Sequence, residues 1–237
     1  MTTTEWEKSE LIHSRLSSEF KHNSNPEHAG RQEAYMKYQM PFWGIPAHQV
    51  EEIAYSVFNQ HPPLTQSEYR HLLRYLFVHG SRREEWYAAI LMSRKFKKFI
   101  HISNVDLYIE IVQKSQWWDI VDTIAVNLIG PSLVTQDLRK WLIPWINHPD
   151  IWVRRTALLT QLKYREKTDY DVLKELIRTT EHETEFFIRK AIGWALREYA
   201  YTDPAAVSIF VDERAGCLSN LSVREAQKGL NKMRFTS

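Results

Sequence analysis

The chain has 237 residues, of which 43% are hydrophobic and 25% are charged, and its formal net charge is +2. This length and composition predict a packed globular protein with one substantial domain or two small ones. Seven glycines and nine prolines are too few for the many tight turns of a β-sandwich or barrel. The single Cys217 excludes an internal disulfide and a cysteine-based zinc site, and it indicates a reducing compartment.

The sequence lacks the patterns of export and of membrane insertion. Residues 1–7 have neither the basic nor the apolar region of a secretory signal, and no apolar run approaches the roughly 18 residues of a membrane span. We therefore expect a cytoplasmic protein without a membrane partner. The mild net charge does not by itself imply nucleic acid. Cations do cluster, at Arg94–Lys98, Arg154–Arg155, Arg189–Lys190 and Lys228–Arg234. Solvated helix faces are the alternative explanation for any one cluster.

Helical patterns follow one another along the chain with short breaks. The predicted helices cover residues 5–22, 27–39, 47–60, 66–79, 83–100, 104–115, 117–129, 136–147, 150–165, 170–181, 185–201, 204–214 and 221–233. Thr65 precedes Glu68 by three residues, the spacing of a capping box. Further N-cap candidates are the polar residues Asn104, Asp150, Asp169 and Ser222. No segment alternates as a strand would, so the sequence predicts an all-α protein.

The C-terminal half contains a repeat of 35 residues. The pairs Val153-Arg154, Ile188-Arg189 and Val223-Arg224 recur at this spacing, each within a helical run. Such a period is typical of solenoids, in which each helix pair buries its apolar face on its neighbours. We therefore predict a right-handed, curved α-solenoid of HEAT-like repeats in which residues 1–237 form one domain. Partners usually bind the concave surface of a solenoid.

The stretch that begins at Gln116 contains the first candidate site. In a helix, the apolar side chains of this stretch form one stripe, made by Trp117, Ile120, Val121, Ile124 and Leu128. Trp118 and Asp122 are four residues apart, so they are neighbours on the helix surface beside that stripe. A carboxylate without a paired general acid suits the stabilisation of a cation or the orientation of a water.

Two further groups of residues could face a ligand. Lys190, Trp194 and Arg197 share one helix face, where the ring could line a groove or be covered by the Lys and Arg stems. Arg154 aligns with Arg189 in the repeat, which favours a structural role for Arg154. Arg155 is then free to bind a phosphate, which its planar guanidinium suits, with a surface salt bridge as the alternative.

Other kinds of site find little support. The sequence has no phosphate-binding glycine motif, and its ten histidines lack metal-ligand spacing. No serine, nor Cys217, has the sequence context of a nucleophile. The residues alone therefore indicate neither a phosphate-binding loop nor a metal site.

Several motifs together resemble the AlkD-type DNA alkylation repair glycosylases, which are built from HEAT-like repeats. These motifs are Ala34-Tyr35-Met36-Lys37, Phe42-Trp43-Gly44-Ile45, Trp117-Trp118-Asp119 to Asp122, Ile151-Trp152-Val153-Arg154-Arg155, and Phe186-Phe187-Ile188 through Gly193-Trp194 to Arg197-Glu198-Tyr199. The resemblance runs from roughly residue 20 to residue 230. It implies excision of cationic N3- and N7-alkylated purines from duplex DNA, without metal, cofactor or base flipping.

The resemblance also implies roles for particular residues. Asp122, Trp118 and Trp194 match residues that face the deoxyribose of the damaged nucleotide. Arg155 matches a residue that contacts the DNA backbone, and Tyr35 matches one near the lesion. We further expect Lys190 and Arg197 to bind DNA, and the protein to act as a monomer. Two alternatives remain open, a solenoid that binds DNA without catalysis and a protein–protein scaffold.

Overall fold

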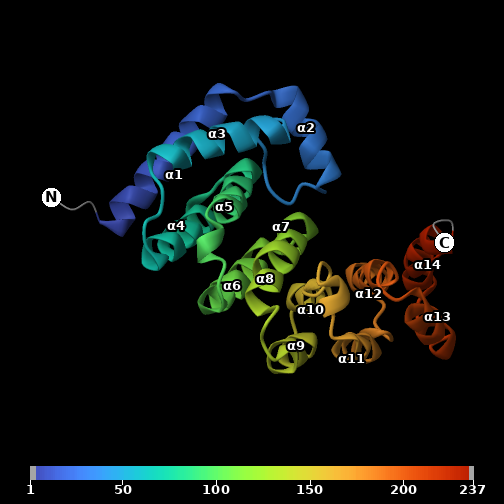
Figure 1. Ribbon diagram of the computed structural model, residues 1–237. Helices are drawn as coiled ribbons and strands as arrows, with labels where there is room; N and C mark the ends of the chain where they lie inside the picture. Colours follow the sequence, from blue (N-terminus) through green and yellow to red (C-terminus); the bar gives the residue numbers. More distant parts are fainter. Residues whose placement is uncertain (1–3, 235–237) are drawn as a thin grey trace. The chain divides into compact units, whose positions relative to one another are not determined.

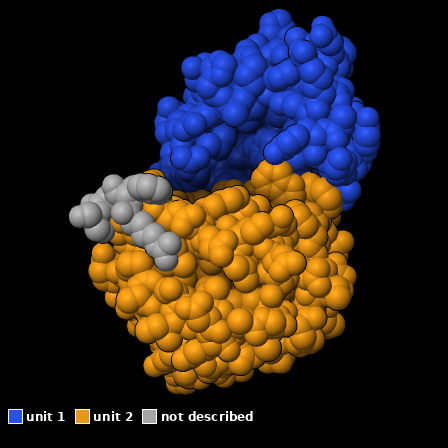
Figure 2. Space-filling view, turned by 90° about the vertical axis from the view of Figure 1, so that its right-hand side faces the viewer, with its two compact units in different colours: residues 1–107 blue, residues 108–237 orange. Residues whose placement is uncertain are grey.

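A computed structural model describes residues 4–234 of the chain. The chain divides into two compact units, Met1–Leu107 and Tyr108–Ser237, which are coloured separately in Figure 2. Each unit is described by itself below. The single domain expected over residues 1–237 stays a prediction.

Unit 1 is a bundle of helices joined by short turns. Its helices are α1 (Glu5–His22), α2 (Pro26–Tyr35), α3 (Ala47–Gln60), α4 (Gln66–His79) and α5 (Arg83–Lys95), followed by 3₁₀ turns at Lys97–Phe99 and Ile102–Asn104. Helix α1 packs against α3 and α4, and α5 packs against the same two helices (Figure 1). Buried residues on α1, such as Leu16 and Phe20, recur at the spacing of one helical face.

A buried carboxylate fixes the loop that joins α2 to α3. Glu84 at the start of α5 is 1% exposed, and its carboxylate accepts hydrogen bonds from the backbone N–H groups of Trp43, Gly44 and Ile45 at 2.9–3.2 Å. Gly44 has φ +87°, and a Cβ there would lie 2.0 Å from the carbonyl oxygen of Asn25. Glycine is therefore required at this turn. The Phe42-Trp43-Gly44-Ile45 motif is thus a rigid connection.

Unit 2 arranges its helices in two layers. After α6 (Val105–Ser115), which crosses the boundary between the units, come α7 (Trp118–Ile124), a π-helical segment (Ala125–Ile129), α8 (Gly130–Leu133), α9 (Leu138–Ile146), α10 (Ile151–Leu159), α11 (Tyr170–Thr180), α12 (Phe186–Tyr199), α13 (Pro204–Glu213) and α14 (Asn220–Arg234). One layer runs α7, α10, α12, α14, with each helix packed on the next, and the second contains α9, α11 and α13 (Figure 1). We call the first the α7–α14 layer.

Several helices end at earlier residues than the sequence predicted. The helix expected over 83–100 ends at Lys95, and a 3₁₀ turn follows at Lys97–Phe99. The helix expected over 117–129 becomes π-helical from Ala125. Asp150 and Asp169 are N-caps as predicted, but Ser222 is not, because Ser219 accepts the hydrogen bond from its backbone N–H. The side-chain oxygen of Asn104 accepts from Arg70, and its amide nitrogen donates to the carbonyl of Phe99.

The predicted fold class is confirmed. Residues 4–234 contain no β-strand, and successive helices of unit 2 stack as in a solenoid of helical repeats. Within the described residues, no helix combines the length and the apolar character needed to cross a bilayer.

Candidate functional site

Helix α7 places Asp122 at the edge of the core of unit 2. Ile120, Val121, Ile124 and Leu128 are at most 1% exposed, so this part of the predicted apolar stripe is buried. Trp117, the first residue of the predicted stripe, is partly exposed and is the N-cap of α7. Trp118 and Asp122, one turn apart on the flank of this stripe, are both partly exposed, as the spacing predicted. The π-helical segment follows directly after α7, and such segments are frequent at functional sites.

Asp122 forms a two-point ion pair with Arg155 of α10. Arg155 Nε donates to Oδ1 and Nη2 donates to Oδ2, both at 2.7 Å, and Nη1 donates to the carbonyl of Phe187 at the start of α12. The side chain of Arg155 is 2% exposed and that of Asp122 is 14% exposed. The expectation that Arg155 is free to bind a ligand is therefore wrong. The physical reason is that α10 lies between α7 and α12, so residue 155 points into the layer.

The environment of Asp122 exerts two opposing influences on its ionisation. Burial raises the pKa of the Asp122 carboxyl above its usual value, because the charged form loses water. The hydrogen bonds and the positive charge of Arg155 oppose this rise. Arg155 is thus the counter-charge that stabilises the ionised carboxylate in a largely buried site.

Arg154 has the structural role that the repeat predicted. It donates from Nε and Nη2 to the two carboxylate oxygens of Glu183 at 3.0 and 2.8 Å, and from Nη1 to the carbonyls of His148 and Pro149. Glu183 lies in the turn between α11 and α12. The two neighbouring arginines therefore bind different carboxylates, and only Arg155 reaches Asp122.

Trp194 of α12 lies among three cations. The guanidinium carbons of Arg155 and Arg197 are each 5.5 Å from the ring centroid of Trp194, and Lys190 Nζ is 5.7 Å from it. These distances lie within the range of cation–π attraction. The ring is partly exposed, so it borders the surface beside the Asp122–Arg155 pair. The Lys and Arg side chains thus lie close to a ring that stays partly exposed, an arrangement that fits both interpretations of the pattern.

A carboxylate that sequence reasoning missed holds two of these cations. Glu225 of α14 accepts from Lys190 Nζ at 2.7 Å and from Arg197 Nη1 at 3.0 Å, and Lys228 Nζ is 2.6 Å from the same carboxylate. The Glu225 side chain is 4% exposed. Glu225 follows Lys190 by 35 residues, so the repeat spacing could have revealed the pair.

Three aromatic rings pack together where α7, α10 and α12 begin. Phe187 lies 4.8 Å from Trp152 and 5.4 Å from Trp117, measured between ring centroids. Arg155 contacts both the ring of Phe187 and its carbonyl. This cluster fixes the ends of α7, α10 and α12 and thereby holds Arg155 in place.

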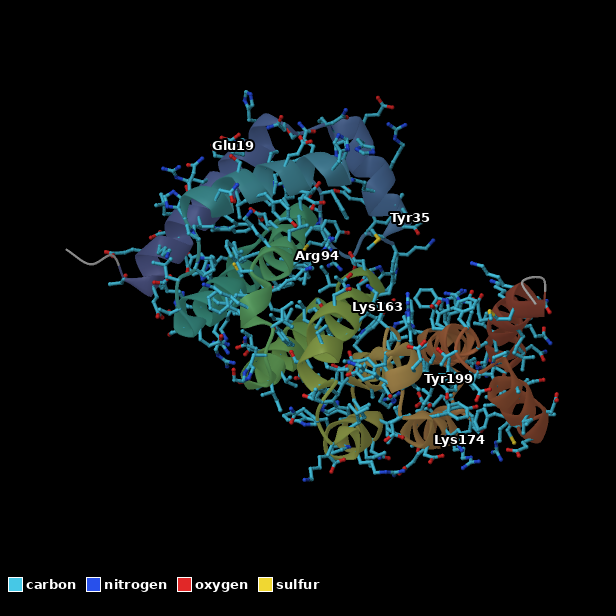
Figure 3. The ribbon with its side chains drawn as sticks, viewed as in Figure 1. Glu19, Tyr35, Arg94, Lys163, Lys174 and Tyr199 are labelled. Atoms are coloured by element: carbon cyan, nitrogen blue, oxygen red, sulfur yellow. The ribbon has the colours of Figure 1, made fainter. Side chains whose placement is uncertain are left out.

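The other predicted site residues lie in unit 1. Tyr35 ends α2 with its side chain 71% exposed, and Arg94 lies near the end of α5; Figure 3 labels both. Lys97 and Lys98 are exposed, so this cationic cluster is available to solvent. The structure brings Asp122, Arg155 and Trp194 together in unit 2, with Lys190 and Arg197 beside them.

The described residues contain no group of three or more His, Cys, Asp or Glu side chains placed to hold a metal ion. The site contains the Asp122 carboxylate paired with Arg155, and the partly exposed rings of Trp118 and Trp194. The cations Lys190 and Arg197 lie beside Trp194. Such a set can stabilise positive charge or orient a water next to a bound polyanion.

Comparison with known proteins identifies the family. Residues 16–230 match the family described as DNA alkylation repair enzyme. A solved structure described as a predicted DNA alkylation repair enzyme from Enterococcus faecalis is 32% identical, with a TM-score of 0.78, and the match covers 87% of this chain and 96% of that one. No curated protein matched the chain. The resemblance inferred from the motifs is thereby confirmed, and the chain belongs to the DNA alkylation repair enzyme family.

Proposed function

We propose that the protein is a DNA glycosylase of base excision repair. Its substrates are cationic alkylated purines in duplex DNA, such as N3-methyladenine and N7-methylguanine. It hydrolyses their N-glycosidic bond as a monomer, without base flipping and without a metal or cofactor. The observation that carries the proposal is the partly exposed carboxylate of Asp122, fixed at two points by Arg155 beside Trp194.

The chemistry of the leaving group matches this site. An alkylated purine carries a positive charge, so the bonding electrons leave with the base and the base departs neutral. Positive charge then develops on the sugar at C1′. The Asp122 carboxylate stabilises that charge and orients the water that adds to C1′, whose proton is released to solvent. Opposite unit charges 4 Å apart attract by about 4 kcal/mol at an effective dielectric constant near 20.

Arg155 acts on this chemistry through Asp122. Two hydrogen bonds at 2.7 Å fix the carboxylate plane, so its oxygens stay where positive charge develops. Because Arg155 is buried, a contact with the DNA backbone would require its guanidinium to move. We therefore assign Arg155 to the orientation of Asp122.

The two tryptophans contribute differently. Trp118 shares the flank of α7 with Asp122, where a ring face can favour a sugar with cationic character, by about 0.5–2 kcal/mol. Trp194 already lies close to three cations of the protein itself. Their positive charge opposes the approach of a further cation to this ring. We infer that Trp194 contacts the sugar mainly through its apolar surface.

Unit 1 supplies further DNA contacts in this proposal. Tyr35 is exposed at the end of α2, and the resemblance matches it to a residue near the lesion, while the exposed Arg94, Lys97 and Lys98 can bind phosphates. Lys190 and Arg197 are each about one quarter exposed, so they can also approach the backbone near Trp194.

The decisive experiment measures release of free 7-methylguanine from methylated duplex by the purified full chain. We expect release by the wild type and its loss in Asp122→Asn. Duplex binding without any base release would favour a non-catalytic DNA-binding protein. Absence of both binding and release would favour a protein–protein scaffold.

A further inference from the structure

Two carboxylates on other helices hold the cations that surround Trp194. The partly exposed Asp122 of α7 binds Arg155, and the buried Glu225 of α14 binds Lys190 and Arg197. All three of these cations approach the ring of Trp194. The proposed mechanism uses Asp122 directly but gives no role to Glu225.

Glu225 bridges cations that come from two turns of α12. Lys190 Nζ binds Oε1 and Arg197 Nη1 binds Oε2, so the carboxylate spans the helix face that carries Trp194. Arg197 also lies 3.4 Å from Glu198, while Lys228 shares Oε1 of Glu225. A single buried carboxylate therefore fixes both cations that flank the ring on α12.

A glycine allows this carboxylate to come so close. A Cβ on Gly193 would lie 2.5 Å from the Cβ of Glu225 and 2.9 Å from the carbonyl oxygen of Ser222. Any larger residue at 193 would push α14 away from α12, because backbone atoms would have to move. Gly193 thus lets α14 pack close to α12, and this packing brings Glu225 to the cations beside the next residue, Trp194.

Glu225 is ionised near neutral pH. Burial alone would raise the pKa of this carboxyl, but hydrogen bonds from Lys190 and Lys228, and their charges, lower it to about 2. The carboxylate is consequently charged wherever the protein is folded near neutral pH, and its hold on the two cations is constant.

We propose that Glu225 is a positioning residue for base excision, which holds Lys190 and Arg197 against Trp194 and thereby sets the orientation of that ring beside Asp122. This inference rests on the proposed glycosylase activity. Glu225 itself is too buried to touch DNA, so it acts only through its neighbours. Misplacement of a substrate-contacting group by about 1 Å can reduce a rate by up to about 100-fold.

The test compares Glu225→Gln with Glu183→Gln. Glu183 is a suitable control because it is also a carboxylate paired with a basic side chain of unit 2, but its partner is Arg154, which it binds at two points. We expect single-turnover excision at saturating enzyme to fall about tenfold in Glu225→Gln. Affinity for undamaged duplex should stay the same or tighten, because a negative charge near the polyanion is removed. Glu183→Gln should excise like the wild type.

A second variant background shows whether Glu225 acts through Trp194. In Trp194→Ala, the further change Glu225→Gln should reduce excision by less than about twofold, because residues that act as a unit are not additive. Equal loss from Glu225→Gln in both backgrounds would overturn the proposal. Loss of affinity in parallel with rate would also overturn it, as would an unchanged rate. If Glu225→Gln fails to fold, Glu225→Asp tests the same contact, because it keeps the charge and shortens the reach to Lys190 and Arg197.

An activity-independent measurement separates this inference from the proposed function. In protein labelled with 5-fluorotryptophan, the Trp194 resonance is the ¹⁹F signal that disappears in Trp194→Phe. We expect it to shift or broaden in Glu225→Gln and to stay unchanged in Glu183→Gln. An unchanged Trp194 signal in Glu225→Gln would overturn the positioning role even if excision is confirmed. A shifted signal in a protein that releases no base would instead reject the glycosylase proposal alone.

Discussion

Asp122 and Arg155 form a two-point ion pair between α7 and α10, with both nitrogen–oxygen distances at 2.7 Å. Removal of one partner from a buried pair is expensive, by about 3–5 kcal/mol, because the other charge remains without a counter-ion. The pair therefore ties the stability of unit 2 to the group proposed to stabilise the sugar cation. Variants of either residue must be measured for both folding and excision.

Asp122→Asn should lose most excision while it retains duplex binding. The amide keeps the shape of the side chain and can still accept one hydrogen bond from Arg155, but it lacks the negative charge. We expect a fall of about 100-fold or more in the single-turnover rate, as for loss of an electrostatic stabiliser. Asp171→Asn on α11, whose side chain is 79% exposed, is the control for loss of a carboxylate. Near wild-type release by Asp122→Asn would remove this residue from the mechanism.

In a plot of excision rate against pH, Arg155→Met should shift the fall in rate on the acid side to higher pH. Burial raises the pKa of Asp122, and Arg155 opposes that rise, so loss of Arg155 raises the pKa further. The carboxylate needed for excision is then protonated at a pH closer to neutral. The measurement is the single-turnover rate against pH, with Arg154→Met as the control, since Arg154 binds Glu183 instead. Identical acid limbs in the two variants would contradict this account.

The same shift predicts how stability depends on pH. A folded-state pKa above the unfolded value means that the folded protein holds the Asp122 proton more tightly. The resulting stability is present below the unfolded value, near 3.8, and is lost as pH rises through the folded value. Relative to Arg154→Met, Arg155→Met should therefore lose more unfolding free energy at neutral pH than at acidic pH. Denaturant titrations across this range measure the difference.

Much of this architecture could be predicted from the sequence. Periodicity indicated the helices, and the Trp118–Asp122 spacing placed both residues beside the buried stripe of α7. The 35-residue repeat separated Arg154 from Arg155 correctly. These predictions succeeded because the spacing of residues within one helix determines which face of that helix each residue occupies.

The partners of the site residues could not be predicted in the same way. Arg155 was expected to face a ligand, because sequence spacing does not reveal that α10 lies between α7 and α12. Glu225 was missed for a related reason: its burial depends on the close approach of α14 that Gly193 allows. Ion pairs between helices depend on packing across the layer, which a helical pattern within one segment does not specify.

The cationic cluster of unit 1 yields a prediction about salt dependence. Lys97 and Lys98 are exposed, so their replacement by Gln should weaken duplex binding without a large effect on folding. Removal of each phosphate-binding cation should lower the slope of log affinity against log salt by about one unit. Lys140→Gln on α9 is a suitable control, because its side chain is 79% exposed in the layer opposite Asp122. An unchanged slope for Lys97 and Lys98 would identify them as solvated surface residues.

The site should select lesions by charge more than by shape. Within residues 4–234, the hydrogen-bond partner of the Asp122 carboxylate is Arg155, and a guanidinium does not serve as the general acid that a departing neutral base would need. Uracil or hypoxanthine would need such help, or strong contacts to the leaving group, whereas a cationic purine departs neutral without it. Excision of 7-methylguanine, a bulky cationic N7 or N3 adduct, uracil and hypoxanthine should be compared in one duplex context. We expect both cationic lesions to be removed and both neutral ones to be left. Efficient removal of uracil, or complete rejection of the bulky cationic adduct, would show that the protein reads the base in a pocket and that catalysis from the sugar side is wrong.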